Sequence, residues 1–166
     1  MRIAHIHKRG KIFATTQALY DKKYKERTAK VIDYVNKILP DALRLVGVTA
    51  PVNVVIKYYK GTTLGSYSFV ENALGVDPRR PMASIVDTLL HELTHARQYH
   101  TGKLKNVFNV EAFRWEHIWE GENFGKGYNG VNSATYDKYR DQPWEVEARE
   151  VAAQLYAEIV SKHPFF

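Results

Sequence analysis

The stretch SIVDTLLHELTHARQYHTG, residues 84–102, constrains the fold of this chain more than any other segment. Ser84 and Asp87 have the spacing of a capping box, which predicts a helix that starts near Ser84. Gly102 suits a C-terminal cap, so we expect the helix to end at residues 101–102. The apolar side chains fall on one arc of this helix, namely Val86, Leu89, Leu90, Leu93 and Ala96. Such an arc must pack on a core, so the helix can only lie with this side inward.

The opposite side of the same helix carries His91 and His95, with Glu92 at its edge. The two imidazoles lie one turn apart, so both can point at one ion and supply two ligands of a tetrahedral zinc. Glu92 would then lie beside the open coordination position, where it could take a proton from water that attacks a carbonyl and pass it to the leaving amine. The alternative is a solvated polar face, because H-E-x-x-H specifies only three positions and occurs by chance.

A zinc site of the two-histidine type needs a third protein ligand, which is often a glutamate. The chain contains no cysteine, so histidine and carboxylate are the ligands that it can offer. The candidate glutamates are Glu111, Glu116, Glu120, Glu122, Glu145, Glu147 and Glu150.

The last three candidates lie on a predicted final helix that begins after Asp141. Its buried side is defined by Trp144, Ala148, Val151, Leu155 and Ile159. Glu150 points away from this side, whereas Glu145 and Glu147 both flank it. If Pro143 is the first helical residue, Glu145 stands at the third position, where a glutamate commonly reaches back to the cap. We therefore expect Glu147 to be the third ligand, with Glu145 or a glutamate of residues 111–122 as the alternatives.

Other residues could orient the expected metal ligands or stabilise an oxyanion. A ligating imidazole usually donates its other N–H to a carboxylate or carbonyl, and Asp87 and Glu150 are candidates for that role. Tyr128, Tyr136 and Tyr139 precede the final helix and could donate a hydrogen bond to an oxyanion. The simpler interpretation of these tyrosines is surface packing.

The segments TLLHELTHARQY and PWEVEAR resemble the zincin metallopeptidases. The second segment is similar to the glutamate helix of the gluzincin branch, as in small bacterial and phage-borne zincin-like domains and the ImmA/IrrE group, where the ligand position corresponds to Glu147. The metzincin pattern does not continue, because Gln98 and Thr101 occupy its glycine and third histidine positions. An SprT-like assignment would need a third histidine, for which His117 is the candidate after His100.

This resemblance implies a zinc-dependent metallopeptidase with His91, His95 and Glu147 as metal ligands and Glu92 as the catalytic base. It implies an α+β, zincin-like fold in which a small, twisted, mostly antiparallel sheet packs on an N-terminal helix, the HExxH helix and a C-terminal ligand helix. The substrate would be a protein or peptide that pairs with an unpaired strand edge within residues 65–77, and WEGENF, residues 119–124, could form the opposite wall.

The other segments of the chain predict both helices and strands, as expected for an α+β fold. Apolar spacing predicts a helix over residues 15–39 that ends at Pro40. Residues 51–61 and 65–70 are predicted strands, and residues 73–81 an extended edge segment, because prolines do not fit a central strand. Residues 103–141 show little periodicity, so we expect loops with a short hairpin over residues 113–124.

The length of 166 residues suits one core, so we expect a single domain over residues 1–166. The N-terminal residues lack the apolar run of a secretory signal, and no segment approaches the roughly 20 apolar residues of a membrane span. We therefore expect a cytoplasmic protein without a membrane partner, or one that a phage or a secretion system delivers.

The charge of the chain suggests a different class of function. The net charge is +6, and the predicted first helix carries a basic group of Lys22, Lys23, Lys25, Arg27 and Lys30. These residues could belong to a nucleic-acid-associated protein with a zincin fold, or to an SprT-like protease that acts on DNA-bound proteins. A phage structural component with a decayed site is a further alternative, and a solvated helix face is the simplest one.

Overall fold

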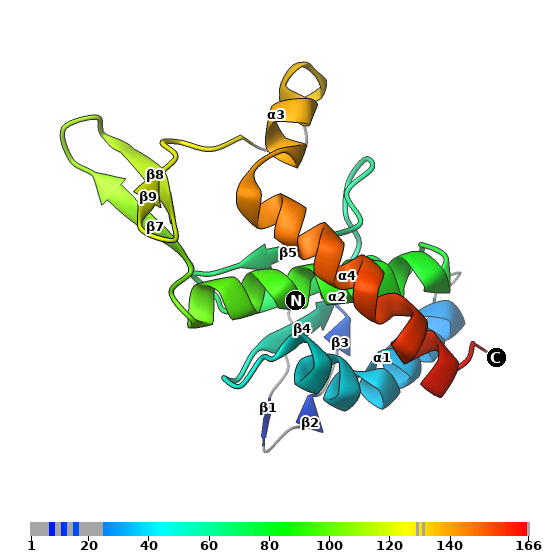
Figure 1. The fold of residues 1–166 in the computed structure, drawn as a ribbon. Helices are drawn as coiled ribbons and strands as arrows, with labels where there is room; N and C mark the ends of the chain where they lie inside the picture. The colour runs from blue at the N-terminus through cyan, green and yellow to red at the C-terminus, as the bar shows by residue number, and fades with distance from the viewer. Residues whose placement is uncertain are drawn as a thin grey trace.

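The computed structural model describes residues 7–8, 11–12, 15–16, 25–128, 130 and 132–165. Within them the chain has a mixed α+β fold, as Figure 1 shows. The strands are β1 (His7–Lys8), β2 (Lys11–Ile12), β3 (Thr15–Thr16), β4 (Asn53–Ile56), β5 (Gly65–Ser68), β6 (Ala73–Val76), β7 (Leu104–Asn109), β8 (Arg114–Trp119) and β9 (Glu122–Asn123). The helices are α1 (Lys25–Val46), α2 (Met82–His100), α3 (Tyr136–Arg140) and α4 (Pro143–Lys162), and a 3₁₀ turn, Ser133–Thr135, precedes α3.

Helix α2 is the central element, and it contacts α1, α4, β5 and β6 (Figure 1). All five side chains of its predicted apolar arc are fully buried, which confirms the face that packs on the core. Gly102 follows the helix with a positive φ of 72°, as a C-terminal cap glycine does. The predicted start was wrong, because α2 begins at Met82 after Pro81 and no side chain caps it. Met82 packs on the core, so tertiary contact extends the helix beyond Ser84.

The four-stranded sheet has the order β3-β4-β6-β5. It is mixed rather than mostly antiparallel, since β3–β4 and β4–β6 are parallel and only β5–β6 is antiparallel. The cause is connectivity: helix α1 lies between β3 and β4 in the chain, whereas a short turn joins β5 to β6. The segment predicted as an edge, residues 73–81, supplies the inner strand β6, and its prolines lie beyond the end of that strand. Among the described strands, β5 and β3 are the two edges of this sheet.

Helix α1 does not end at Pro40, which lies inside it. A proline within a helix costs about 3 kcal/mol. Beyond it, Ala42, Leu43 and Val46 are buried in the main core. Burial of a Leu or Val side chain contributes roughly 1.5–3 kcal/mol each, so the packing of this last part of α1 outweighs the penalty.

The basic group of the predicted first helix is only partly described. Lys25 and Lys30 are exposed, and Lys22 and Lys23 lie outside the described residues. Arg27 donates hydrogen bonds to the carbonyl oxygens of Pro78 and Arg80, so its guanidinium ties α1 to the loop after β6. The nucleic-acid alternative stays a prediction.

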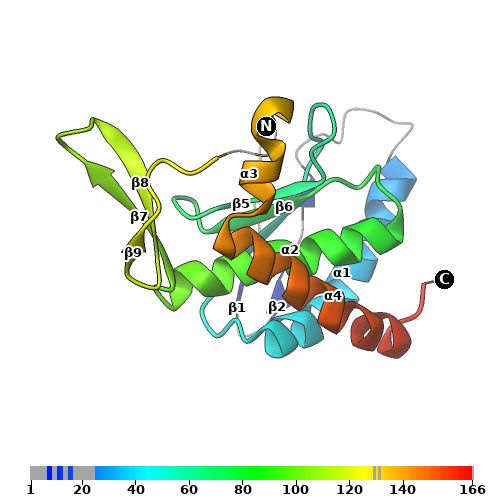
Figure 2. The same cartoon turned by 45° about the horizontal axis from the view of Figure 1, so that its top comes forward.

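Residues 104–123 form a three-stranded sheet, β7-β8-β9, where mostly loops were expected. The hairpin of β7 and β8 extends from the far end of α2 (Figure 2). Leu104 and Trp119 pair across these strands and pack with Trp144 of α4 in a small second cluster. This cluster joins elements far apart in the sequence, which is why the local pattern did not reveal it.

Helix α4 agrees with its prediction and begins with Pro143 at the first position. Trp144, Ala148 and Ile159 are buried, and Glu150 is exposed. In Figures 1 and 2 α4 crosses α2, and the two helices are in contact. No helix among the described residues is long and apolar enough to span a membrane.

Candidate metal centre

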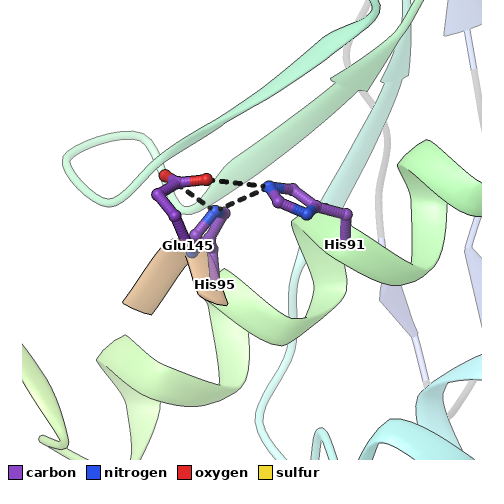
Figure 3. A group of neighbouring side chains, drawn as sticks. All are labelled: His91, His95 and Glu145. Carbon is purple, nitrogen blue, oxygen red and sulfur yellow. Dashed lines mark hydrogen bonds and ion pairs between the residues drawn. The ribbon is translucent and has the colours of Figure 1, made fainter. Parts of the chain in front are cut away.

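His91, His95 and Glu145 form a group among the described residues that could hold a metal ion. The two rings project from successive turns of α2 towards the Glu145 carboxylate at the start of α4 (Figure 3). The Nε2 atoms of the two histidines are 3.1 Å apart. The Glu145 oxygens lie 3.2 Å from Nε2 of His91 and 3.4 Å from Nε2 of His95. The expected pair of histidines thus faces a common point.

The distances between these nitrogen and oxygen atoms are close to those between the ligands of a bound zinc ion. Ligand atoms about 2.0–2.1 Å from a tetrahedral zinc lie about 3.3 Å from one another. The distances of 3.1, 3.2 and 3.4 Å between the three side chains scatter around that value. The nitrogen and oxygen donors therefore fit a small divalent cation.

The site is buried, so the solvated-face alternative does not describe it. His95 and Glu145 expose 8% and 5% of their surface, and Glu92 exposes 7%. Burial by itself would lower the pKa of His95, but the hydrogen bond and charge of Glu145 and the charge of Glu92 raise this pKa to about 9. Burial raises the pKa of Glu145, but hydrogen bonds from the two histidines outweigh it and hold the pKa well below its usual range. The carboxylates thus favour a positive charge between these side chains.

The structure places Glu145, rather than the expected Glu147, beside the histidines. Glu147 points instead to a cationic pair, with Oε1 3.0 Å from Arg97 Nη2 and 2.8 Å from Lys103 Nζ. Its Oε2 accepts a hydrogen bond of 2.8 Å from the amide of Gln98. These partners hold the Glu147 carboxylate against Gln98, which itself lies between Glu147 and His95. Glu145 therefore lies beside the histidine Nε2 atoms, where the sequence prediction expected Glu147.

The capping role expected of Glu145 is also wrong. Glu145 does stand third in α4, but no side chain makes a capping hydrogen bond at this end of the helix. The backbone N–H of Gln142, which a capping glutamate would accept, already donates to the carbonyl of Tyr139 at 3.2 Å. The Glu145 carboxylate is therefore left to the histidines.

Glu92 lies under strand β5. Burial raises the pKa of its carboxyl and outweighs the charges of His95 and His91, which lower it. A Cβ atom on Gly65 would meet the Thr88 methyl group and lie 2.5 Å from the Gly75 carbonyl oxygen and 3.5 Å from Glu92 Cγ. Glycine at this position therefore lets β5 approach α2 closely enough to cover Glu92.

Of the three candidate tyrosines, Tyr139 reaches the site. Burial raises the pKa of its hydroxyl, and the nearby charges of Glu145 and Glu92 raise it further. Tyr136 is exposed, and Tyr128 packs under the ammonium group of Lys138. Tyr139 is thus the tyrosine that can donate a hydrogen bond within the site.

The other histidine candidates lie elsewhere. His117 stacks on Trp144 with ring centroids 5.0 Å apart, and His100 bonds to Asn72 Oδ1 at 2.9 Å. Neither belongs to the metal-binding group, so the third histidine of an SprT-like site is not brought there.

The glutamates of residues 111–122 also lie outside the group. Glu116 pairs with Arg114, and Glu120 pairs with Lys103. Glu111 and Glu122 are exposed.

The ring of His95 has a hydrogen-bond partner, Gln98, that the sequence prediction missed. His95 Nδ1 lies 2.8 Å from Oε1 of Gln98, whereas the expected orienting residues Asp87 and Glu150 are exposed. Gln98 follows His95 by three positions, so it lies on the same side of the helix. That spacing could have identified it, had amides been considered beside carboxylates.

Comparison of the chain with known protein families, with curated proteins and with solved structures finds no match. The chemical interpretation of the site therefore depends on its geometry and its residues.

Proposed function

We propose that this chain is a zinc-dependent metallopeptidase of the zincin type, in which His91, His95 and Glu145 hold the metal. The observation that carries the proposal is the convergence of these three ligands with Glu92 buried next to His91 on the same helix. A zinc ion held there would supply an electrophile that polarises a peptide carbonyl and lowers the pKa of water.

Glu92 is the proton carrier in this proposal. Burial raises the pKa of its carboxyl, which suits a group that must take up a proton and release it again. Glu92 would remove a proton from the attacking water, and the same proton would then pass to the amine that leaves when the C–N bond breaks. Both proton transfers are complete within one turnover, so Glu92 ends as it began.

Tyr139 supports the same reaction. Burial and the neighbouring carboxylates raise its pKa, so its hydroxyl keeps its proton. A neutral hydroxyl in this position can donate a hydrogen bond to the oxygen of a polarised carbonyl. Tyr139 is therefore the residue of the chain that would stabilise negative charge on the substrate.

The substrate would be an extended peptide that pairs with strand β5. β5 is an edge of its sheet, so its outer N–H and C=O groups can accept a further strand. Beyond its end, Phe69 stacks on Tyr99 with centroids 5.1 Å apart and meets Trp115 of β8 edge-on at 6.3 Å. Because Tyr99 lies one turn beyond His95 on α2, a peptide on β5 would meet these rings close to the metal centre. We therefore expect substrates with apolar side chains near the cleaved bond.

The first experiment is elemental analysis of the full chain purified without added metal. We expect about one zinc per chain in the wild type and none in His95→Ala. The analysis must also separate zinc from iron, since two histidines and one carboxylate hold iron(II) in oxygenases. No metal in the wild type, even after zinc is offered, would refute the proposal.

The second experiment measures hydrolysis of a quenched fluorescent casein. Glu92→Gln should keep its zinc and lose at least about 100-fold in turnover, because the proton carrier is gone. Glu150→Gln makes the same charge change at an exposed position of α4 and should leave turnover unchanged. Turnover by Glu92→Gln at the wild-type rate would show that the reaction does not use this residue.

A further inference from the structure

Gln98 has an unusual environment for an amide side chain. It is fully buried on α2, one turn from His95. Its Nε2 lies 3.0 Å from the carbonyl oxygen of Trp144 and 2.8 Å from Oε2 of Glu147, and its Oε1 lies 2.8 Å from Nδ1 of His95. The amide therefore links the second predicted ligand to the backbone and side chains of α4.

The chemistry of these partners determines which way the amide points. The Trp144 carbonyl can only accept a hydrogen bond. Glu147 forms ion pairs with Arg97 at 3.0 Å and Lys103 at 2.8 Å, so its carboxylate also accepts. The NH₂ group of Gln98 must face these two acceptors, and its oxygen must then face His95.

The amide oxygen in turn determines the state of the ring. An oxygen that accepts from His95 Nδ1 requires a proton on Nδ1. In the neutral ring the lone pair is then on Nε2, the atom that lies 3.1 Å from Nε2 of His91 and 3.4 Å from the Glu145 carboxylate. This is the tautomer in which Nε2 can bind a metal.

We propose that Gln98, held by Glu147, is a positioning residue that keeps the proton of His95 on Nδ1 and directs its Nε2 lone pair to the metal centre. The inference depends on the proposed metal function, because it concerns how one of its ligands is prepared. Glu147 is in turn held by Arg97 of α2 and by Lys103, which precedes β7. The arrangement therefore links the histidine to α4 and to the start of the β7–β8 hairpin.

The test compares zinc affinity in the full chain by competition with a chromophoric chelator. Gln98→Leu keeps much of the side-chain volume but has no acceptor for Nδ1. We expect it to bind zinc 10–100-fold more weakly than the wild type, as is typical when an outer partner of a ligand is lost. Thr94→Val is the matched control, because Thr94 is buried on α2 and bonds to the Leu90 carbonyl rather than to the site.

The second readout is the ¹⁵N NMR spectrum of the His95 ring, which a merely structural role for Gln98 would not change. We expect a slowly exchanging proton on Nδ1 in the wild type and in Thr94→Val, and its loss or rapid exchange in Gln98→Leu. A wild-type ring without this proton would overturn the inference, and so would Gln98→Leu with wild-type zinc affinity. A wild-type protein that shows the Nδ1 proton but binds no zinc would support the hydrogen bond and contradict the proposed function alone.

Discussion

Glu145 and Glu147 are two positions apart on α4, yet they have separate tasks at the candidate site. Glu145 faces both histidines, and Glu147 faces Gln98, Arg97 and Lys103. Two helical positions correspond to a rotation of about 200°, so both side chains can flank one buried side. Which of them meets the histidines depends on how α4 is rotated and shifted along α2.

The separate tasks predict different losses of zinc affinity. Glu145→Gln removes an anionic ligand, so we expect at least about a 100-fold weaker affinity. Glu147→Gln still offers an oxygen to Gln98, so we expect less than about a 10-fold change. Isothermal titration of both variants with zinc, beside the exposed control Glu150→Gln, provides the comparison. A larger loss in Glu147→Gln than in Glu145→Gln would return the ligand role to Glu147.

At the scale of elements, the contact between β5 and α2 brings the proposed substrate edge to the proposed proton carrier. Gly65 makes this contact close, since any side chain there would meet Thr88 and the neighbouring strand. The side chain of Glu92 lies next to the same strand, because a Cβ on Gly65 would be 3.5 Å from Glu92 Cγ. A displacement of β5 would therefore alter both the sheet and the environment of Glu92.

Gly65→Ala tests this contact. The added methyl group must push β5 from α2, and overpacking of this kind usually costs about 1–3 kcal/mol of unfolding free energy. We also expect a fall in casein turnover at unchanged zinc content, because the proposed metal ligands lie on α2 and α4. Urea unfolding and the turnover assay measure the two effects, with Ser68→Ala at the other end of β5 as the control. Wild-type stability and turnover in Gly65→Ala would show that the contact is not tight.

At the scale of the whole molecule, Asp77 joins the segments that follow β4 and β6. It is fully buried at the end of β6, where it pairs with Arg79 and accepts from the backbone N–H of Tyr59 at 3.2 Å. Burial by itself would raise the pKa of Asp77, but hydrogen bonds from Arg79 and Tyr59 outweigh it and lower this pKa. The ionised carboxylate therefore stabilises the folded state.

The sign of the resulting pH dependence follows from the lowered pKa. The stabilisation is complete above the pKa of an unfolded aspartate, about 3.9, and is lost as the pH falls through the lower pKa of the folded state. We expect Asp77→Asn to unfold with about 1–3 kcal/mol less free energy at pH 7, and this difference from the wild type to shrink below about pH 4. Urea unfolding at pH 7 and pH 3 measures it, with the exposed Asp33→Asn as the control. A difference that did not change with pH would mean that Asp77 contributes through shape rather than charge.

The sequence by itself determined the features that depend on neighbours within one helix. The apolar arc of α2, the convergence of His91 and His95, and Pro143 as the first residue of α4 all follow from helical spacing. Local rules ended α1 too early, because the packing of its last part on the core outweighs Pro40. The hairpin predicted over residues 113–124 is confirmed by β8 and β9, whereas β7 and the contact of this sheet with Trp144 were not predicted.

Only the tertiary structure decided which glutamate lies beside the two histidines, that β5 is an edge strand, and which side chain contacts Nδ1 of His95. Each of these depends on the relative rotation and offset of elements that are far apart in the chain. Those quantities are determined when many apolar side chains pack together at once, so no short segment contains them. The sequence therefore predicts that the histidines can share an ion, and the packing of α4 and β5 on α2 decides which other residues surround it.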